Sequence, residues 1–217
     1  MNKQAGFTLI ELAIVLVIIG LLLGGVLRGQ ELINSAKVKN MVRDFQNVQV
    51  YLYGYQDRFR ALPGDDHNAN THLTGGTVAT TAGQTQNGIL DGAWNTATDT
   101  DETCVFWQHV RLAGLSPGST QVSCSNAVNT YQPRNSDGGL IGIQSLSTFG
   151  NQISGMTGAY AVCSNAILGR FARQIDSTLD DGVGDTGVVR VQVLNGAANA
   201  GVAAPLDATP YMVCMSF

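Results

Sequence analysis

The chain has 217 residues, and charged side chains make up 13% of them, against roughly 25% in an average soluble domain. The charges are unevenly distributed: residues 1–60 hold seven Lys or Arg and four Asp or Glu, whereas residues 61–217 hold five and twelve. No lysine follows Lys39, which excludes a nucleic-acid or phosphate binder of the ordinary basic kind in the acidic part.

An apolar segment begins close to the amino end. Residues 7–27 read FTLIELAIVLVIIGLLLGGVL, with Glu11 as the one ionisable side chain. As a helix that rises ~1.5 Å per residue, the segment spans roughly 31 Å, which matches one bilayer crossing. No small-residue cleavage site follows Leu27, whereas Gly6 stands before the segment. We therefore predict a transmembrane helix that stays in the mature protein.

Glu11 lies inside this apolar segment, where an unpaired carboxylate costs several kcal/mol. Cleavage between Gly6 and Phe7 would create an α-amino cation one helical turn before Glu11. That amine, on the same chain or on a neighbouring subunit, would neutralise the carboxylate and set the register of packed helices. The alternative is a signal anchor that tolerates a Glu near its end.

The segment Gly6-Phe7-Thr8-Leu9-Ile10-Glu11-Leu12 and the apolar run after it resemble the amino terminus of type IV pilins and type II secretion pseudopilins. The resemblance implies cleavage after Gly6 by a prepilin peptidase, N-methylation of Phe7, and a role for Glu11 in filament assembly. It also implies an inner-membrane assembly platform and further copies of the chain as partners. Many pilins of this class carry a proline near the position of Arg28, and this sequence has none there.

A polar stretch follows the apolar segment and continues its helical pattern. One stripe of apolar residues recurs in steps of three and four: Met41, Phe45, Val48, Leu52, Tyr55 and Phe59. The first proline is Pro63, so we predict one helix over about 7–58, roughly 78 Å long at ~1.5 Å per residue. An exposed coiled coil is the weaker interpretation, because the stripe covers fewer than three heptads. Four basic residues, which we expect to face acidic parts of neighbouring subunits, gather at the join: Arg28, Lys37, Lys39 and Arg43.

Residues 61–217 have the pattern of a globular head. ALPGDD at 61–66 predicts a turn, the stretch to about residue 100 a long loop, and residues 101–114 a helix. Short β-type runs follow at 140–143, 157–163, 188–194 and 211–217, and a helical pattern runs through Ile167, Leu168, Phe171, Ile175 and Leu179. The fold class is therefore α+β, with a mostly antiparallel sheet packed on the long helix, accessory helices and long loops.

The head also resembles a known group. ALPGD, WQHVRLAGLSPG and IDSTLDDG are similar to segments in the heads of large pilin-like proteins, which implies the pilin fold. The domain organisation expected is a leader peptide at 1–6, a transmembrane and filament-core helix at 7–28, an amphipathic half at 29–60, and the head at 61–217.

All four cysteines lie in the head, and none forms a CxxC pair. An even number in an oxidising compartment predicts disulfides rather than zinc. Of the three possible connectivities we favour Cys104 with Cys124 and Cys163 with Cys214. The second pair would resemble the carboxy-terminal disulfide loop of many pilins.

Enzyme motifs are absent from the sequence. His67, His72 and His109 show no HExxH spacing, and neither a GxSxG elbow nor a phosphate loop occurs. We expect a chain that is not an enzyme, with histidines that are hydrogen-bonded internally or face solvent.

One acidic segment could bind a metal. Four carboxylates surround Gly182–Gly184 and supply the hard oxygen ligands that Ca²⁺ prefers: Asp176, Asp180, Asp181 and Asp185. Some pseudopilins carry calcium in a late loop. The spacing differs from an EF-hand, however, and an acidic helix end with a turn is the simpler interpretation, so we expect no cofactor.

These features predict a structural subunit of a type IV pilus, with apolar helices in the filament core and heads in the outer shell. The chain would be anchored in the inner membrane before assembly and lie in an extracellular filament afterwards. Two alternatives stay open: a periplasmic type II secretion pseudopilin, and a minor pilin that acts as initiator or tip adhesin. A membrane-anchored domain that does not polymerise is a third.

Overall fold

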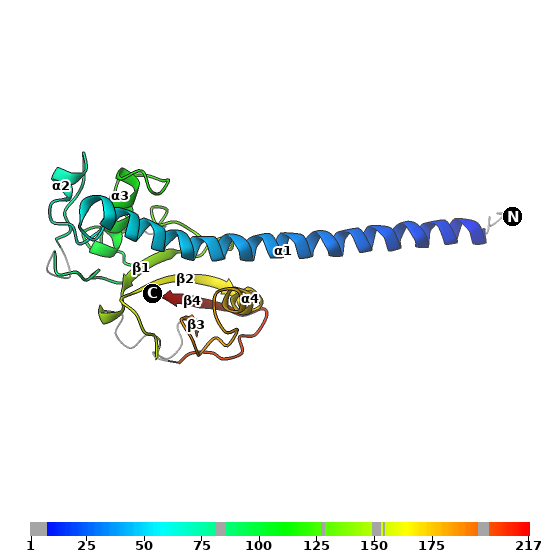
Figure 1. Cartoon of the computed structure of the whole chain (residues 1–217). Coiled ribbons are helices and arrows are strands. Elements are labelled where there is room, and N and C mark those ends of the chain that lie inside the picture. The colour runs from blue at the N-terminus through cyan, green and yellow to red at the C-terminus, as the bar shows by residue number, and fades with distance from the viewer. Residues whose placement is uncertain (1–7, 81–85, 127–128, 149–152, 154, 195–199) are drawn as a thin grey trace. The chain divides into compact units, whose positions relative to one another are not determined.

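A computed structural model describes residues 8–80, 86–126, 129–148, 153, 155–194 and 200–217. The elements in chain order are α1 (Leu9–Phe59), α2 (Ala69–His72), α3 (Glu102–Leu112), β1 (Ile141–Ser145), the 3₁₀ turn η1 (Leu146–Thr148), β2 (Tyr160–Leu168), α4 (Gly169–Leu179), β3 (Val189–Val193) and β4 (Pro210–Ser216) (Figure 1). The chain divides into two compact units, residues 1–38 and 39–217, and α1 contributes to both.

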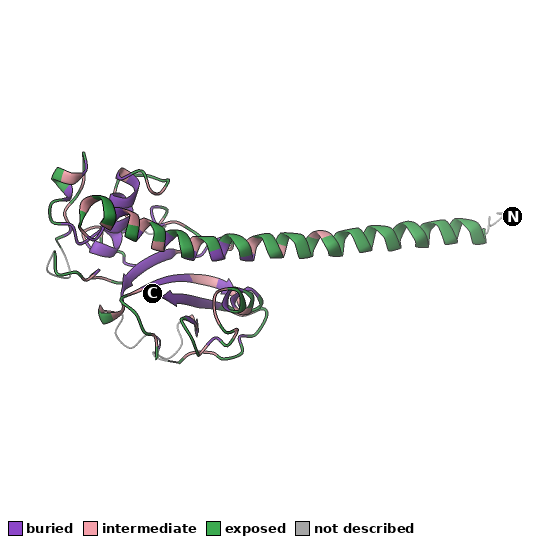
Figure 2. Cartoon of the chain, in the orientation of Figure 1, coloured by how far each residue is buried: buried purple, intermediate pink, exposed green. Residues whose placement is uncertain are grey.

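The described part of the first unit consists almost entirely of the apolar half of α1. Its most apolar window of 18 residues has a mean hydropathy of 2.8, and none of this window is buried (Figure 2). The helix is therefore long and apolar enough to cross a membrane. Its glycines at positions 20, 24, 25 and 29 have no atom within 4 Å of where a Cβ would lie, so their GxxxG spacings leave an open surface for close helix packing.

In the second unit, α1 buries one face against the head. The residues of the predicted stripe from Met41 to Tyr55 are at most 2% exposed, and Phe59 is half-buried. The helix ends because Arg60 takes the left-handed conformation, with φ of 55°, shortly before Pro63. The helix bounds predicted from the sequence agree with the structure to within about two residues.

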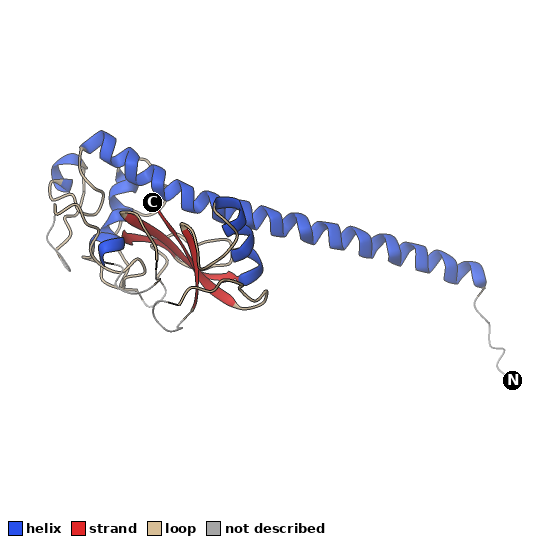
Figure 3. Cartoon of the chain, turned by 60° about the horizontal axis from the view of Figure 1, so that its bottom comes forward, coloured by secondary structure: helices blue, strands red, loops and turns tan. Residues whose placement is uncertain are grey.

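The sheet lies in the second unit, where α1 runs beside it (Figure 3). Its strand order is β1-β2-β4-β3, and every neighbouring pair is antiparallel. The long helix, the antiparallel sheet and the additional helices form the predicted α+β layout of a pilin.

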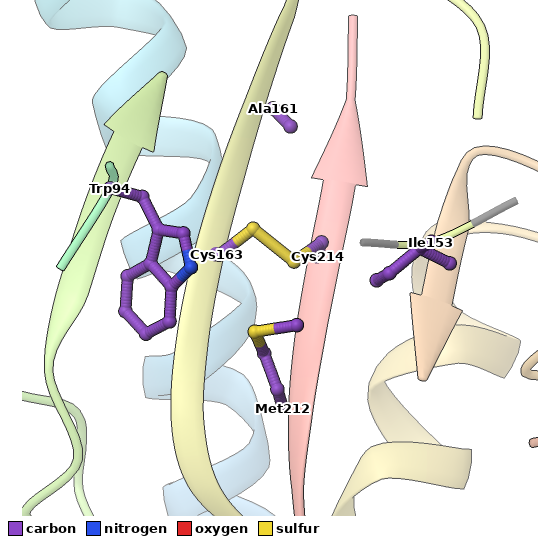
Figure 4. Close-up of a cluster of buried hydrophobic side chains, with 6 residues drawn as sticks. All are labelled: Trp94, Ile153, Ala161, Cys163, Met212 and Cys214. Atoms are coloured by element: carbon purple, nitrogen blue, oxygen red, sulfur yellow. A yellow bond between two sulfur atoms is a disulfide. The ribbon is translucent and has the colours of Figure 1, made fainter. Parts of the chain in front are cut away.

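A buried cluster packs around the central strands of this sheet (Figure 4). It comprises Trp94, Ile153, Ala161, Met212 and the disulfide-bonded pair on β2 and β4. Trp94 comes from the long loop, and its backbone N–H donates to Gln144 Oε1 on β1 at 2.8 Å. The cluster therefore ties this loop to the sheet.

Two predictions for the head need correction. The sequence pattern predicts a helix through Ile167 and Leu168, but both lie in β2, where Ile167 pairs with Tyr211. A bulge between Ser164 and Ile167, with Ala166 at φ of 57°, breaks the alternation that would have marked a strand. In addition, the stretch predicted to be loop contains one helical turn, α2.

Candidate functional site

The residues predicted to direct processing and assembly lie at the amino end. Gly6 and Phe7 lie outside the described residues, so the geometry of the predicted cleavage site is not described. Glu11 lies in the first turn of α1, and its side chain is exposed. The structure thus presents the carboxylate at the helix terminus, where unpaired backbone N–H groups and the helix dipole favour a negative charge.

Thr8 is the immediate partner of Glu11. The Thr8 hydroxyl and backbone N–H donate to Glu11 Oε2 at 2.7 and 2.8 Å, and the Glu11 backbone N–H lies 3.3 Å from Thr8 Oγ1. This reciprocal pattern is a capping box, with Thr8 as N-cap and Glu11 three residues later. Sequence reasoning missed Thr8, although the spacing Thr-x-x-Glu before an apolar run would have identified it.

The capping box limits what Glu11 can do chemically. Both donors from Thr8 reach Oε2, and Oε1 has no donor among the described residues. A carboxylate oxygen accepts two hydrogen bonds, so a second cationic or N–H donor can bind while the cap stays intact. The geometry therefore allows Glu11 to cap its own helix and to accept an amine at the same time.

The ALPGDD turn at the end of α1 positions the head loops. The Asp65 carboxylate accepts backbone N–H groups from Gln86, Asn87 and Gly88, with Gly88 at 2.7 Å from Oδ2. Gly64 has φ of 95°, and a Cβ there would lie 2.5 Å from the Glu102 carbonyl oxygen, so glycine is required. This signature thus organises the fold, and both of its carboxylates are buried.

Asp66 is the centre of a buried hydrogen-bond network. Tyr55 donates its hydroxyl to Asp66 Oδ2 at 2.8 Å, and His72 Nδ1 lies 2.7 Å from the same oxygen. Burial opposes ionisation of Asp66, but hydrogen bonds from His72 and Tyr55 outweigh it and hold its pKa below the ordinary value. Burial lowers the pKa of His109, whose Nδ1 accepts the Gly64 N–H at 2.9 Å. Both histidines have structural partners, as the sequence analysis expected.

Both disulfides join the favoured pairs. Cys104 bonds to Cys124, with Cα atoms 6.2 Å apart, and Cys163 bonds to Cys214 across adjacent strands, with Cα atoms 4.1 Å apart. In the chain-entropy account, each bond adds about 3–4 kcal/mol to the free energy of unfolding.

We expect the intact mass of the purified chain to stay unchanged after unfolding and alkylation without reductant, since both bonds leave no thiol to react. After unfolding in reductant, four alkyl groups should be added, one per cysteine. Four labelled thiols in the chain unfolded without reductant would contradict both disulfides.

The structure brings together three of the four acidic residues considered for calcium. Oxygen atoms of Asp176, Asp180 and Asp181 lie within 4.8 Å of one another, whereas Asp185 is outside this group. Asp180 Oδ2 accepts the Val189 N–H at 3.0 Å, and the two oxygens of Asp181 accept from the Val183 N–H and the Thr186 hydroxyl. Burial raises the pKa of Asp176 to about 6, and its Oδ2 has no donor in the described part of the chain. Asp180 and Asp181, which accept the hydrogen bonds given above, already stabilise the turn.

Comparison with known protein families gives a match at the amino end. Residues 1–27 match the family model of the prokaryotic N-terminal methylation motif. No curated protein and no solved structure matches the chain. The matched region contains the predicted cleavage site, Thr8, Glu11 and most of the apolar helix.

Proposed function

We propose that this chain, whose first 27 residues carry the methylation motif of the type IV pilin and pseudopilin family, is a structural subunit of a type IV pilus. The observation that carries the proposal is the motif on an exposed apolar helix that continues into a folded head. A helix of this kind needs a lipid or protein partner, because exposed apolar surface of this extent is rare in a soluble monomer.

In the proposed mechanism, the apolar helix first anchors the chain in the membrane, and the helix and the head then take their places in the filament. Before assembly, the apolar half of α1 anchors the chain in the inner membrane. A prepilin peptidase removes residues 1–6, the amine of Phe7 is methylated, and the assembly platform moves the helix into a growing filament. There, Glu11 accepts the amine of Phe7 from an adjoining copy, and the heads form the outer surface. The segments 7–28, 29–60 and 61–217 would serve as core helix, amphipathic link and head.

We propose a non-enzymatic role for the head as well. Asp65, Asp66 and His109 are buried and form hydrogen bonds within the head, as in the network around Asp66. Its surface would supply contacts between subunits, and no nucleic-acid binding is proposed.

Electron cryo-microscopy of filaments sheared from cells would test the main proposal. The expected result is a helical polymer of this chain, whose first residue by mass spectrometry is N-methylated Phe7. Processed subunits that stay in the cell envelope, with no surface filament, would contradict the pilus and support a type II secretion pseudopilin. A copy number far below that of another pilin in the same filaments would indicate a minor pilin.

The head is proposed to fold without a resident metal ion, because Asp180 and Asp181 already bind backbone and hydroxyl donors in their own turn. We expect the thermal midpoint of the purified chain to be the same with a calcium chelator as with excess Ca²⁺. A midpoint several degrees lower with chelator, and not in an Asp176→Asn variant, would instead show that calcium binds at this loop.

A further inference from the structure

An open polar groove of about 340 Å³ lies in the second unit, between α1 and the segment that precedes β1. The helix side is formed by Asn40, Arg43, Asp44 and Asn47, and the opposite side includes Arg134 and Ser136. We call this feature the arginine groove. Its volume is within the range of sites that bind small ligands or a few residues of a partner chain.

The groove holds two cations that have no carboxylate partner among the described residues. Arg43 is exposed on α1 and forms no ion pair there. Arg134 donates to the carbonyl oxygens of Gly138 and Asn129, both at 2.6 Å, and these bonds hold the guanidinium in place without neutralising it. The one acid in the lining, Asp44, is half-buried, and its burial raises its pKa to about 6. A carboxyl with this pKa is mostly ionised at neutral pH and offsets one guanidinium, so the lining keeps a net positive charge, which suits an anionic partner.

The same chain carries a surface of opposite charge. Residues 180–185, which we call the acidic loop, hold three aspartates and no basic residue. Val183 lies in this loop and is 41% exposed, so the loop presents both charge and an apolar contact. Exposed Asp207 and Asp57 in the second unit form ion pairs with Arg173 and Arg60. Asp180 and Asp181 instead accept backbone and hydroxyl donors of their own turn and have no ion pair among the described residues, so they keep their negative charge.

We propose that the acidic loop of one subunit docks in the arginine groove of a second copy of the chain. The inference rests on the proposed filament and identifies a contact between its heads. Because groove and loop are different surfaces of one chain, each subunit can bind one copy through each surface. Such head-to-tail contacts generate an open helical polymer or a ring, whereas a self-complementary surface generates a closed dimer.

Cysteine cross-linking in sheared filaments tests the contact directly. The described residues contain no free cysteine, so introduced thiols would be the reactive ones. With Ser136→Cys and Val183→Cys in one chain, oxidation should produce a ladder of covalent dimers, trimers and higher multimers on a non-reducing gel. The matched control pairs Ser136→Cys with Thr71→Cys, an exposed position on α2, and should stay monomeric.

Charge variants give a second readout, the salt concentration at which filaments fall apart. Arg43→Asp should lower this concentration, and adding Asp185→Arg should restore it, because the reversed pair regains its attraction. Asp44→Asn, one residue from Arg43, should raise it. Opposite effects at adjacent positions would not arise from damage to the fold.

The outcomes distinguish a failure of the docking contact from a failure of the proposed pilus. Wild-type filaments without a ladder, or with an equal ladder in the control, would overturn the docking and leave the pilus proposal standing. Absence of both wild-type filaments and ladder would overturn both. A ladder specific to residues 136 and 183, together with rescue by Asp185→Arg, supports the contact.

Discussion

Replacing Glu11 by alanine should leave cleavage after Gly6 intact and prevent filament assembly. In the proposed filament, the carboxylate accepts the amine of Phe7 from the next subunit inside an apolar core. Its removal leaves a buried cation without a partner, which costs about 3–5 kcal/mol. A loss of about 3 kcal/mol corresponds to a contact weakened by roughly 100-fold, and the contact recurs at every subunit. We expect normal processing by mass spectrometry and no filaments in the sheared fraction.

Two further variants separate the charge of Glu11 from its capping bonds. Glu11→Gln keeps an oxygen that accepts from Thr8 but removes the negative charge, so assembly should fail as it does with alanine. Thr8→Val keeps the charge and removes the hydroxyl, which should cost about 1 kcal/mol of helix capping and leave filaments that form in smaller amounts. If Glu11 acted only as a cap, Thr8→Val would prevent assembly as fully as Glu11→Ala.

The long helix could be predicted from the sequence because its signals are periodic and local. The spacing from Met41 to Phe59 in steps of three and four identified the buried face of the helix, and Pro63 indicated where the helix ends. The antiparallel strands followed from short alternating runs between turns. The cysteine pairing was only favoured from the sequence, since connectivity depends on which strands are neighbours, here β2 and β4.

Features set by long-range contacts could not be predicted in the same way. The bulge at Ala166 depends on how β2 pairs with β4, so the apolar spacing around it imitated a helix. The role of Asp65 depends on a loop more than 20 residues away, whose backbone N–H groups it accepts. The arginine groove joins residues from α1 and from the segment near Arg134, and only the fold places them together.

The second large prediction concerns Glu102, whose ionisation should make the head less stable as the pH rises. Glu102 lies in the first turn of α3, is 1% exposed, and accepts the Asp91 N–H at 2.8 Å through Oε2. Its Oε1 has no donor among the residues that the structure describes. Burial raises its pKa to about 8; the hydrogen bond from the Asp91 N–H opposes this rise, and the neighbouring charges of Asp65 and Asp91 support it. The folded head therefore holds Glu102 as a neutral acid at neutral pH.

The direction of the pH effect follows from the difference in the pKa of Glu102 between the unfolded chain and the folded head. In the unfolded chain Glu102 ionises near its ordinary pKa of 4.5, whereas in the folded head it keeps its proton up to about pH 8. Between these values the folded state binds more protons, so the free energy of unfolding falls as the pH rises. The contribution of protonated Glu102 to the free energy of unfolding is complete below pH 4.5 and lost above about pH 8, and its size is about 3–5 kcal/mol.

Glu102→Gln is the matched variant. Its amide oxygen can accept the Asp91 N–H, and its amide group can donate to Asp65 in place of the carboxylic proton. Urea unfolding of the full chain in detergent should give a wild-type free energy that falls from pH 5 to pH 9, and a much smaller decline for the variant. Asp44 and Asp176 have pKa values raised to about 6 and contribute a decline to both proteins. Burial also raises the pKa of Asp65, so the difference between the two proteins reports the ionisation of Glu102 together with its coupling to Asp65. Equal declines in both would show that Glu102 is already ionised in the folded head, and that Asp65 and Asp91 accommodate a third charge.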